Sequence, residues 1–161
     1  MLTFDCPDEM DFEDARLKRN EDISGFRTPR QISESAQEDF AEHILKAPDA
    51  RFWAIRRSDR RKPVALVGLE RIEWENGNAE TSVVFIDAED EERRAIFRGL
   101  LAKGFAELRL THIYTQVYLC SPLLDFYLEQ AEALAGTVID LPIGKYWAGI
   151  YHGSKLVVFA R

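Results

Sequence analysis

The hydrophobic pattern changes its period between residues 79 and 108. Residues 79–86 read AETSVVFI, and the β-branched and aromatic run from Ser82 to Ile86 predicts a strand buried on both faces. After an acidic loop at 87–92, the apolar residues take helical spacing, at Ile96, Phe97, Leu100, Leu101, Phe105 and Leu108. A strand that runs into a helix leaves the first N–H groups of the helix unpaired, which makes a natural anion site.

The N-terminal third predicts one short strand and two helices. Residues 2–5 form the strand, and Pro7 with Asp8 suits the start of the first helix. Ser33 or Ser35 caps the second helix, which Pro48 ends. The spacing places four residues of this second helix on its inward face: Ala36, Phe40, Ile44 and Leu45.

The middle of the chain predicts two antiparallel hairpins in succession. Residues 52–56 and 64–74 are the first two strands, with a turn at 58–62 between them. Residues 75–78 contain an Asn-Gly pair, the strongest short-range hairpin signal, and lead into the strand at 79–86.

The C-terminal third predicts a crossover and a closing pair of strands. A strand at 112–119 follows the long helix and should lie parallel to the strand at 79–86. Ser121 and Pro122 open another helix, which Gly136 stops, and strands at 136–141 and 155–160 close the chain. We expect the aromatic segment between them to pack at the end of the sheet.

These elements together predict an α/β fold in a single domain over residues 1–161. Its sheet is mixed and mostly antiparallel, with one parallel βαβ crossover and helices on both faces.

Composition narrows the function classes. The net charge of −7 lacks the electrostatic footprint of a nucleic-acid binder, and the arginine-rich run at 56–62 is typical of a solvated loop. Cys6 and Cys120 suggest neither a disulfide framework nor a zinc site, which fits a cytoplasmic protein. The acidic first residues do not have the pattern of a signal peptide, and no apolar run approaches the ~20 residues that span a membrane.

The order of elements and several short motifs together resemble the GNAT superfamily of acyl-CoA-dependent N-acyltransferases. The similarity is greatest to the branch of ribosomal-protein alanine and nucleotide-aminosugar N-acetyltransferases. It covers nearly the whole chain and rests on the following collinear matches: Arg19-Asn20, Pro63–Trp74 with Glu75-Asn76, Ala79-Glu80, 105–108 with Ile113-Tyr114, Phe126-Tyr127, and Tyr151-His152 before Val157-Val158.

The resemblance implies acetyl-CoA or another acyl-CoA as donor and a small-molecule or peptide amine as acceptor, with neither a nucleic acid nor a membrane as partner. In such enzymes two neighbouring parallel strands part, and the pantetheine arm binds the backbone between them. Here that backbone would be residues Val83, Val84, Phe85 and Ile86. The resemblance also places Cys120 or Ser121 near the cofactor, at the position where the family usually has an asparagine.

The pyrophosphate loop of the family departs from its usual form in this chain. That loop normally carries glycines, which let backbone N–H groups approach the phosphates. Residues 88–96 contain no glycine, and five of the six residues 87–92 are acidic. These acids repel a pyrophosphate, although they also suit the first turn of a helix. Arg93 and Arg94 are the candidates for phosphate contact.

Two residues are candidates for proton transfer. Glu80 could take the proton of the amine, directly or through water, and the alternative is that its carboxylate holds the hairpin at 76–78. Tyr127 could protonate the leaving thiolate, and the alternative is a tyrosine that only fills the core. His43, His112 and His152 are expected to be structural.

The sequence leaves two functions open. The first is transfer of an acetyl or other acyl group from a CoA thioester to a primary amine. The second is a non-catalytic or repurposed GNAT-like binding module that has lost normal acetyl-CoA binding. A donor carried on an acyl carrier protein ranks last. A homodimer through the final strand is a further possibility, because an exposed strand edge can pair with a second copy.

Overall fold

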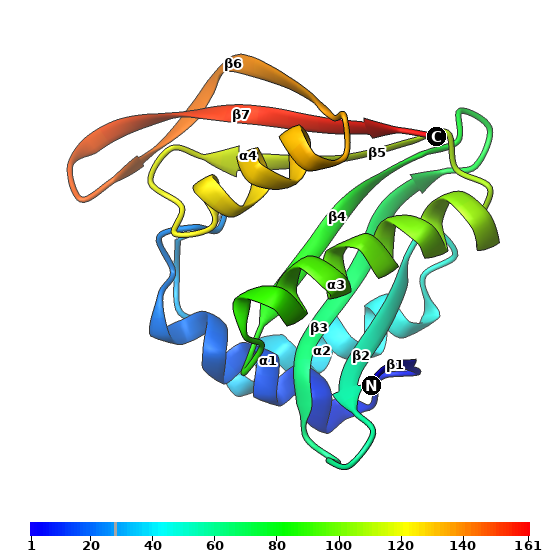
Figure 1. Ribbon diagram of the computed structural model, residues 1–161. Coiled ribbons are helices and arrows are strands. Elements are labelled where there is room, and N and C mark those ends of the chain that lie inside the picture. Colours follow the sequence, from blue (N-terminus) through cyan, green and yellow to red (C-terminus); the bar gives the residue numbers. More distant parts are fainter. Residues whose placement is uncertain (28) are drawn as a thin grey trace.

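The computed structural model describes residues 1–27 and 29–161. One seven-stranded sheet in the order β1-β2-β3-β4-β5-β7-β6 has helices on both faces (Figure 1). The strands are β1 Leu2–Asp5, β2 Arg51–Arg57, β3 Pro63–Glu73, β4 Asn78–Phe85, β5 His112–Tyr118, β6 Thr137–Trp147 and β7 Ile150–Ala160. The helices are α1 Glu9–Glu21, α2 Glu34–Lys46, α3 Asp90–Ala102 and α4 Leu124–Ala133, and a π-helical turn, Lys103–Glu107, extends α3.

The strand directions confirm the predicted fold class. β1 to β4 pair antiparallel in chain order, β4 and β5 are parallel, and β5, β7 and β6 are antiparallel. The Asn76-Gly77 turn forms as expected, with Gly77 at φ +66° in the left-handed region that favours glycine. Two hairpins and one crossover therefore build the sheet.

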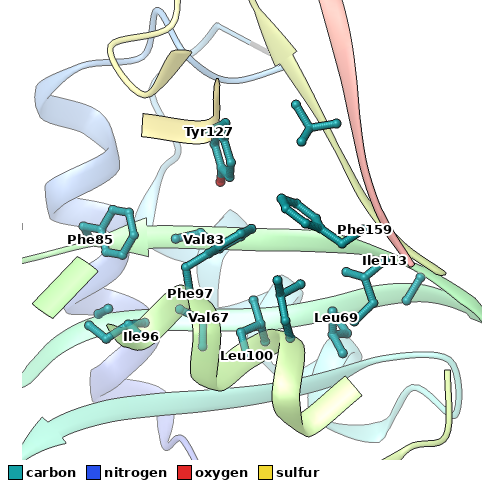
Figure 2. Close-up of a cluster of buried hydrophobic side chains, with 14 of the residues drawn as sticks. Val67, Leu69, Val83, Phe85, Ile96, Phe97, Leu100, Ile113, Tyr127 and Phe159 are labelled. Carbon is teal, nitrogen blue, oxygen red and sulfur yellow. The ribbon is translucent and has the colours of Figure 1, made fainter. Parts of the chain in front are cut away.

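The larger core lies between the sheet and α3 with α4. Phe97 is fully buried at its centre, and its ring packs edge-on against Phe126, Tyr127 and Phe159 (Figure 2). Val83 and Phe85 face this core from β4. The apolar residues that have helical spacing between 96 and 108 therefore lie on the face of α3 and its π-helical extension that packs against the sheet.

A smaller core lies on the opposite face, under α1 and α2. Phe12 is fully buried there and packs against the rings of Phe40 and Phe52. Val84 and Ile86, which alternate with the residues of the larger core, pack against this cluster. The α1–α2 face and the α3–α4 face of β4 are therefore distinct surfaces.

The predicted inward face of α2 is partly wrong. Gln37 and Ala41 are its buried residues, whereas Ala36 is exposed and Phe40 and Leu45 are 38% and 45% exposed. The reason is that α2 packs mainly on α1 and only at its edge on β2. Ser33 is the N-cap, and its hydroxyl accepts from the Ala36 N–H.

Two boundaries differ from the prediction. α3 begins at Asp90, so three acids assigned to the loop lie in the first helical turn, where they favourably face the helix dipole. β6 and β7 continue through the aromatic segment into one long hairpin that turns at Ala148-Gly149. β6 and β1, not the final strand, are consequently the two edges of the sheet, so a strand-to-strand dimer contact would use β6 or β1.

None of the helices described here is long and apolar enough to cross a membrane.

Candidate active site

β4 and β5 part after a short parallel contact. Their paired residues are Asn78–Glu80 and His112–Tyr114, after which β4 continues to Phe85 and β5 to Tyr118 without pairing to each other. Figure 1 shows the two strands together near the C-terminus and far apart at their other ends. The backbone of β4 beyond Glu80 therefore has an edge that a ligand can pair with.

A cavity of about 540 Å³ occupies the opening between these strands. Its floor on the α1–α2 face consists of residues of β3 and β4, where Leu66 pairs with Val84, Glu70 pairs with Glu80, and Ser82 lies between Glu80 and Val84 on the same side. The side of the cavity toward α4 is lined by strand residues that point to the opposite face of the sheet, and by one residue of α4. These are Thr81 and Val83 of β4, Thr115 and Val117 of β5, and Tyr127. Because the cavity reaches both faces of the sheet, ligands from the two sides can meet within it.

Glu80 stands at the point where the strands part, and two arginines hold it. Its Oε1 accepts from Arg27 Nη2 at 2.6 Å and its Oε2 from Arg71 Nη1 at 2.7 Å. Its side chain is 15% exposed. Both oxygens are thus oriented, and the carboxylate is fixed at the mouth of the cavity.

Another carboxylate, that of Glu73, holds the turn at 76–78, while Glu80 bonds Arg71 across the β3–β4 hairpin. Glu73 Oε2 accepts from the side-chain amides of Asn76 and Asn78 at 2.9 and 3.1 Å. These bonds lower the pKa of Glu73. Glu80 has no part in the turn and belongs to the cavity.

Tyr127 reaches the cavity from α4. Figure 2 shows its ring extending from the helix toward β4, with the oxygen at the end nearest the sheet. Burial raises the pKa of Tyr127 to about 12, and the hydroxyls of Thr115 and Thr81 act in the opposite direction. The phenol is therefore protonated at neutral pH and can donate a proton but not accept one.

The other predicted cofactor residues are divided between the cavity and its surroundings. Val83 and Val84 line the cavity. The ring of Phe85 packs edge-to-face against Phe126, and the Ile86 N–H donates to the Val64 carbonyl, so both residues have contacts within the fold.

The predicted phosphate ligands and the cysteine bond to other groups. Arg93 Nε donates to the Ala88 carbonyl at 2.9 Å, and Arg94 Nη2 lies 3.4 Å from Glu129 on α4. The Cys120 thiol donates to the Ser24 carbonyl at 3.4 Å. Among the residues described, these three lie outside the lining of the cavity.

A carboxylate of the chain itself forms a capping box at the start of α3, where Glu89 is the N-cap residue. Glu92 accepts from the Glu89 N–H at 3.0 Å and from Arg57 through two bonds of 2.7 Å. Arg57 also bonds Asp87 at 3.1 Å. The acids at 87–92 are thus partly neutralised, and the interpretation of the arginine-rich run as a solvated loop is wrong for Arg57.

The Glu92 contact predicts an acid-dependent loss of stability. Hydrogen bonds from Arg57 lower the pKa of Glu92 from 4.5 to about 2. A depressed carboxylate pKa stabilises the fold above its unfolded value, and this contribution is lost as the pH falls from about 4.5 toward about 2. Urea unfolding of wild type and Glu92→Gln should differ at pH 7 and converge near pH 2. A difference that persists unchanged at pH 2 would rule out this origin.

The loop between α1 and α2 is held over the cavity by Lys145 of β6. Its ammonium donates to the carbonyls of Ser24 and Phe26 and lies 4.4 Å from the centre of the Tyr118 ring. Burial lowers the pKa of Lys145. Sequence reasoning missed Lys145, Arg27 and Arg71. The partners of Lys145 and Arg27 are 53 or more residues away in sequence, and Arg71 lies at a bulge in β3 that the sequence did not reveal.

The fold defined by this sheet order, the parted parallel strands and the flanking helices is the GNAT fold. No family model and no curated protein matches the sequence. A mutant form of the spermidine/spermine N-acetyltransferase SpeG from Vibrio cholerae superposes with a TM-score of 0.83 at 16% identity, covering 99% of this chain and 93% of that one.

Two further solved structures are similar over the same length. The Vibrio cholerae spermidine N-acetyltransferase in complex with CoA and spermine has a TM-score of 0.80 at 17% identity, with 99% and 95% of the two chains covered. The dodecameric intermediate state of that enzyme has a TM-score of 0.77 at 16% identity, covering 99% and 93%. At this identity the likeness concerns the fold.

Proposed function

We propose that this protein is an N-acyltransferase that moves an acetyl or other acyl group from a CoA thioester to a primary amine. The observation that best supports this function is the cavity between the parted strands, with Glu80 on one face of β4 and Tyr127 on the other. A protein of the same fold binds CoA and spermine, which supports a thioester donor and an amine acceptor. The resemblance to ribosomal-protein alanine and nucleotide-aminosugar N-acetyltransferases adds peptide N-termini and aminosugars as candidate acceptors. We propose that the reaction takes place in the cytoplasm.

The proposed chemistry requires two proton transfers. The neutral amine attacks the thioester carbonyl, the C–N bond forms, and the C–S bond of the resulting tetrahedral intermediate breaks. Glu80 receives the ammonium proton, directly or through water, and its two arginines keep it in place. Tyr127 donates its proton to the departing thiolate, so amide and free thiol leave together and the phenol regains its proton from solvent.

The chain fits the two ends of a CoA donor differently. The edge of β4 beyond Glu80 offers backbone groups to the pantetheine arm. At the helix start, where backbone N–H groups would bind a pyrophosphate, the Glu92 carboxylate already accepts from the N–H of the N-cap residue Glu89 and adds negative charge. We therefore assign most of the donor recognition to the pantetheine and the acyl group.

Thermal shift with acetyl-CoA and with acetyl-pantetheine tests this assignment. Ligand at a hundred times its dissociation constant should stabilise the fold by about 2.7 kcal/mol. We expect both compounds to raise the melting temperature when each is at that multiple. If neither compound raises the melting temperature at millimolar concentration, the transferase proposal is refuted.

One observation favours a second function, a GNAT-fold module that no longer binds acetyl-CoA. It is the bidentate Arg57–Glu92 pair at the start of α3, which replaces an external anion by an internal one. The thermal-shift experiment separates the two functions, because this module would bind neither donor.

A further inference from the structure

The cavity changes character along its floor. At one end Leu66 and Val84 lie side by side, Ser82 follows with its partner Gly68 under the ring of Phe52, and Glu70 and Glu80 form the other end. All three pairs face α1 and α2, because strand residues two apart point to the same side. The four residue-to-residue steps from Glu80 to Val84 span about 13 Å of extended chain.

The apolar end is larger than the strand pair alone. Phe52 lies directly over Gly68, where an added Cβ would come within 2.6 Å of its ring. Phe40 and Ala36 of α2 also line the cavity, and Phe40 remains 38% exposed although it packs against Phe12 and Phe52. Arg16 and Arg19 of α1 and Gln37 of α2 belong to the lining as well. An apolar group placed here would cover aromatic surface that is otherwise left to water.

The charged end contains one carboxylate that is already paired and one that is not. Arg27 and Arg71 hold Glu80. Glu70 forms no ion pair or side-chain hydrogen bond with any of the residues that the structure describes. An ammonium group entering the cavity can therefore pair with Glu70, beside the proposed base.

The apolar end belongs to the acceptor side of the reaction. Leu66, Val84 and the two glutamates share the α1–α2 face, whereas Tyr127, the proposed donor of a proton to the thiolate, lies on the other face with Thr81 and Val83. The thiol side of the donor and the body of the amine are therefore on opposite sides of the parted strands.

We propose that the acceptor is a monoamine with an apolar body, whose ammonium lies at Glu70 and Glu80 and whose aromatic or branched aliphatic end lies under Phe40. This inference rests on the proposed acyl transfer. A polyamine would instead place a second charge against Leu66 and Val84, at the cost of desolvating it. The substrate class thus differs from that of the enzymes of similar fold.

A matched series of amines tests the proposal with acetyl-CoA as donor and thiol release as readout. 4-Phenylbutylamine, n-butylamine and 1,4-diaminobutane share one linker and differ only at the far end. We expect kcat/KM for 4-phenylbutylamine to exceed that for n-butylamine on the order of tenfold or more, with 1,4-diaminobutane and spermidine below both. Acetylation that favours the diamine or spermidine overturns the proposal and leaves the transferase function standing.

Variants at neighbouring positions of α2 localise the effect. Ala36→Asp puts a carboxylate at the apolar end, and because Ala36 is exposed in the first helical turn, the fold tolerates it. We expect it to reduce the preference for 4-phenylbutylamine over 1,4-diaminobutane at least fivefold, on the order of one favourable contact between the new carboxylate and the second ammonium of the diamine. Ala36→Asn controls for size, and Ser35→Asp adds the same charge outside the cavity lining and should leave the preference unchanged.

Two further outcomes are informative. If octanoyl-CoA is strongly preferred to acetyl-CoA while the amines do not differ, the apolar end holds the acyl chain and the proposal is wrong. If no amine is acetylated, the proposed function fails, and calorimetric titration of the same amines decides the inference on its own. Equal affinity for 4-phenylbutylamine and n-butylamine would then refute it.

Discussion

Replacing Phe97 with alanine is expected to lower the free energy of unfolding by about 3–5 kcal/mol. Phe97 is fully buried between α3 and the sheet, and its ring centre lies 5.4–5.7 Å from those of Phe126, Tyr127 and Phe159. Truncation removes the transfer energy of the ring and leaves a cavity that three large rings cannot close. Urea unfolding monitored by circular dichroism measures the change.

This loss is a large fraction of the 5–15 kcal/mol typical of a domain. Phe97→Leu retains most of the volume and should cost clearly less. Leu17→Ala, at a position that is 52% exposed, should change stability by no more than about 0.5 kcal/mol. If Phe97→Ala were as mild as Leu17→Ala, Phe97 would not be the centre of the larger core.

Replacing Tyr127 with phenylalanine is expected to lower kcat on the order of a hundredfold, the lower end of the range for general acid catalysis. The phenol is the group that can protonate a departing thiolate from the α4 side, and burial keeps its pKa at about 12. Because an acid this weak transfers its proton less readily than one near neutral pH, we expect no larger effect. Steady-state rates with saturating acetyl-CoA measure it.

The control for Tyr127 removes a hydroxyl far from the cavity. Tyr146→Phe, at a position on β6 that is 74% exposed, should leave kcat unchanged. The acetyl-CoA thermal shift should persist in Tyr127→Phe, since the ring that fills the core remains. The wild-type rate should also hold up to pH 10, because Tyr127 loses its proton only near 12. Wild-type turnover in Tyr127→Phe would show that Tyr127 only fills the core.

The interpretation of the acidic segment at 87–92 shows where sequence reasoning reached its limit. Its acids and the absence of glycine were evident, and they raised the question of phosphate binding. The cation that pairs with these acids was not evident, because Arg57 lies 30 residues from Asp87 and 35 from Glu92 in sequence. The same holds for Glu80, whose partner Arg27 is 53 residues away.

The helices show a related limit. In α3 the apolar period predicted the buried face correctly, because a helix that crosses a sheet buries one continuous stripe. In α2 the same reasoning misplaced Ala36 and Phe40, because that helix packs on another helix and leaves part of its stripe to line the cavity. Which residues of a helix are buried therefore depended on the element against which the helix packs, and the helix's own residues do not specify that element.

Local patterns along this chain were enough for the order of elements, the Asn76-Gly77 hairpin and the parallel crossover, because period, turn chemistry and chain connectivity all act over short distances. The pairing of Glu80 with Arg27 and Arg71, the internal anion at Glu92 and the graded floor of the cavity arose only from the folded chain. Each of these depends on side chains that are distant in sequence and that the sheet register brings into contact.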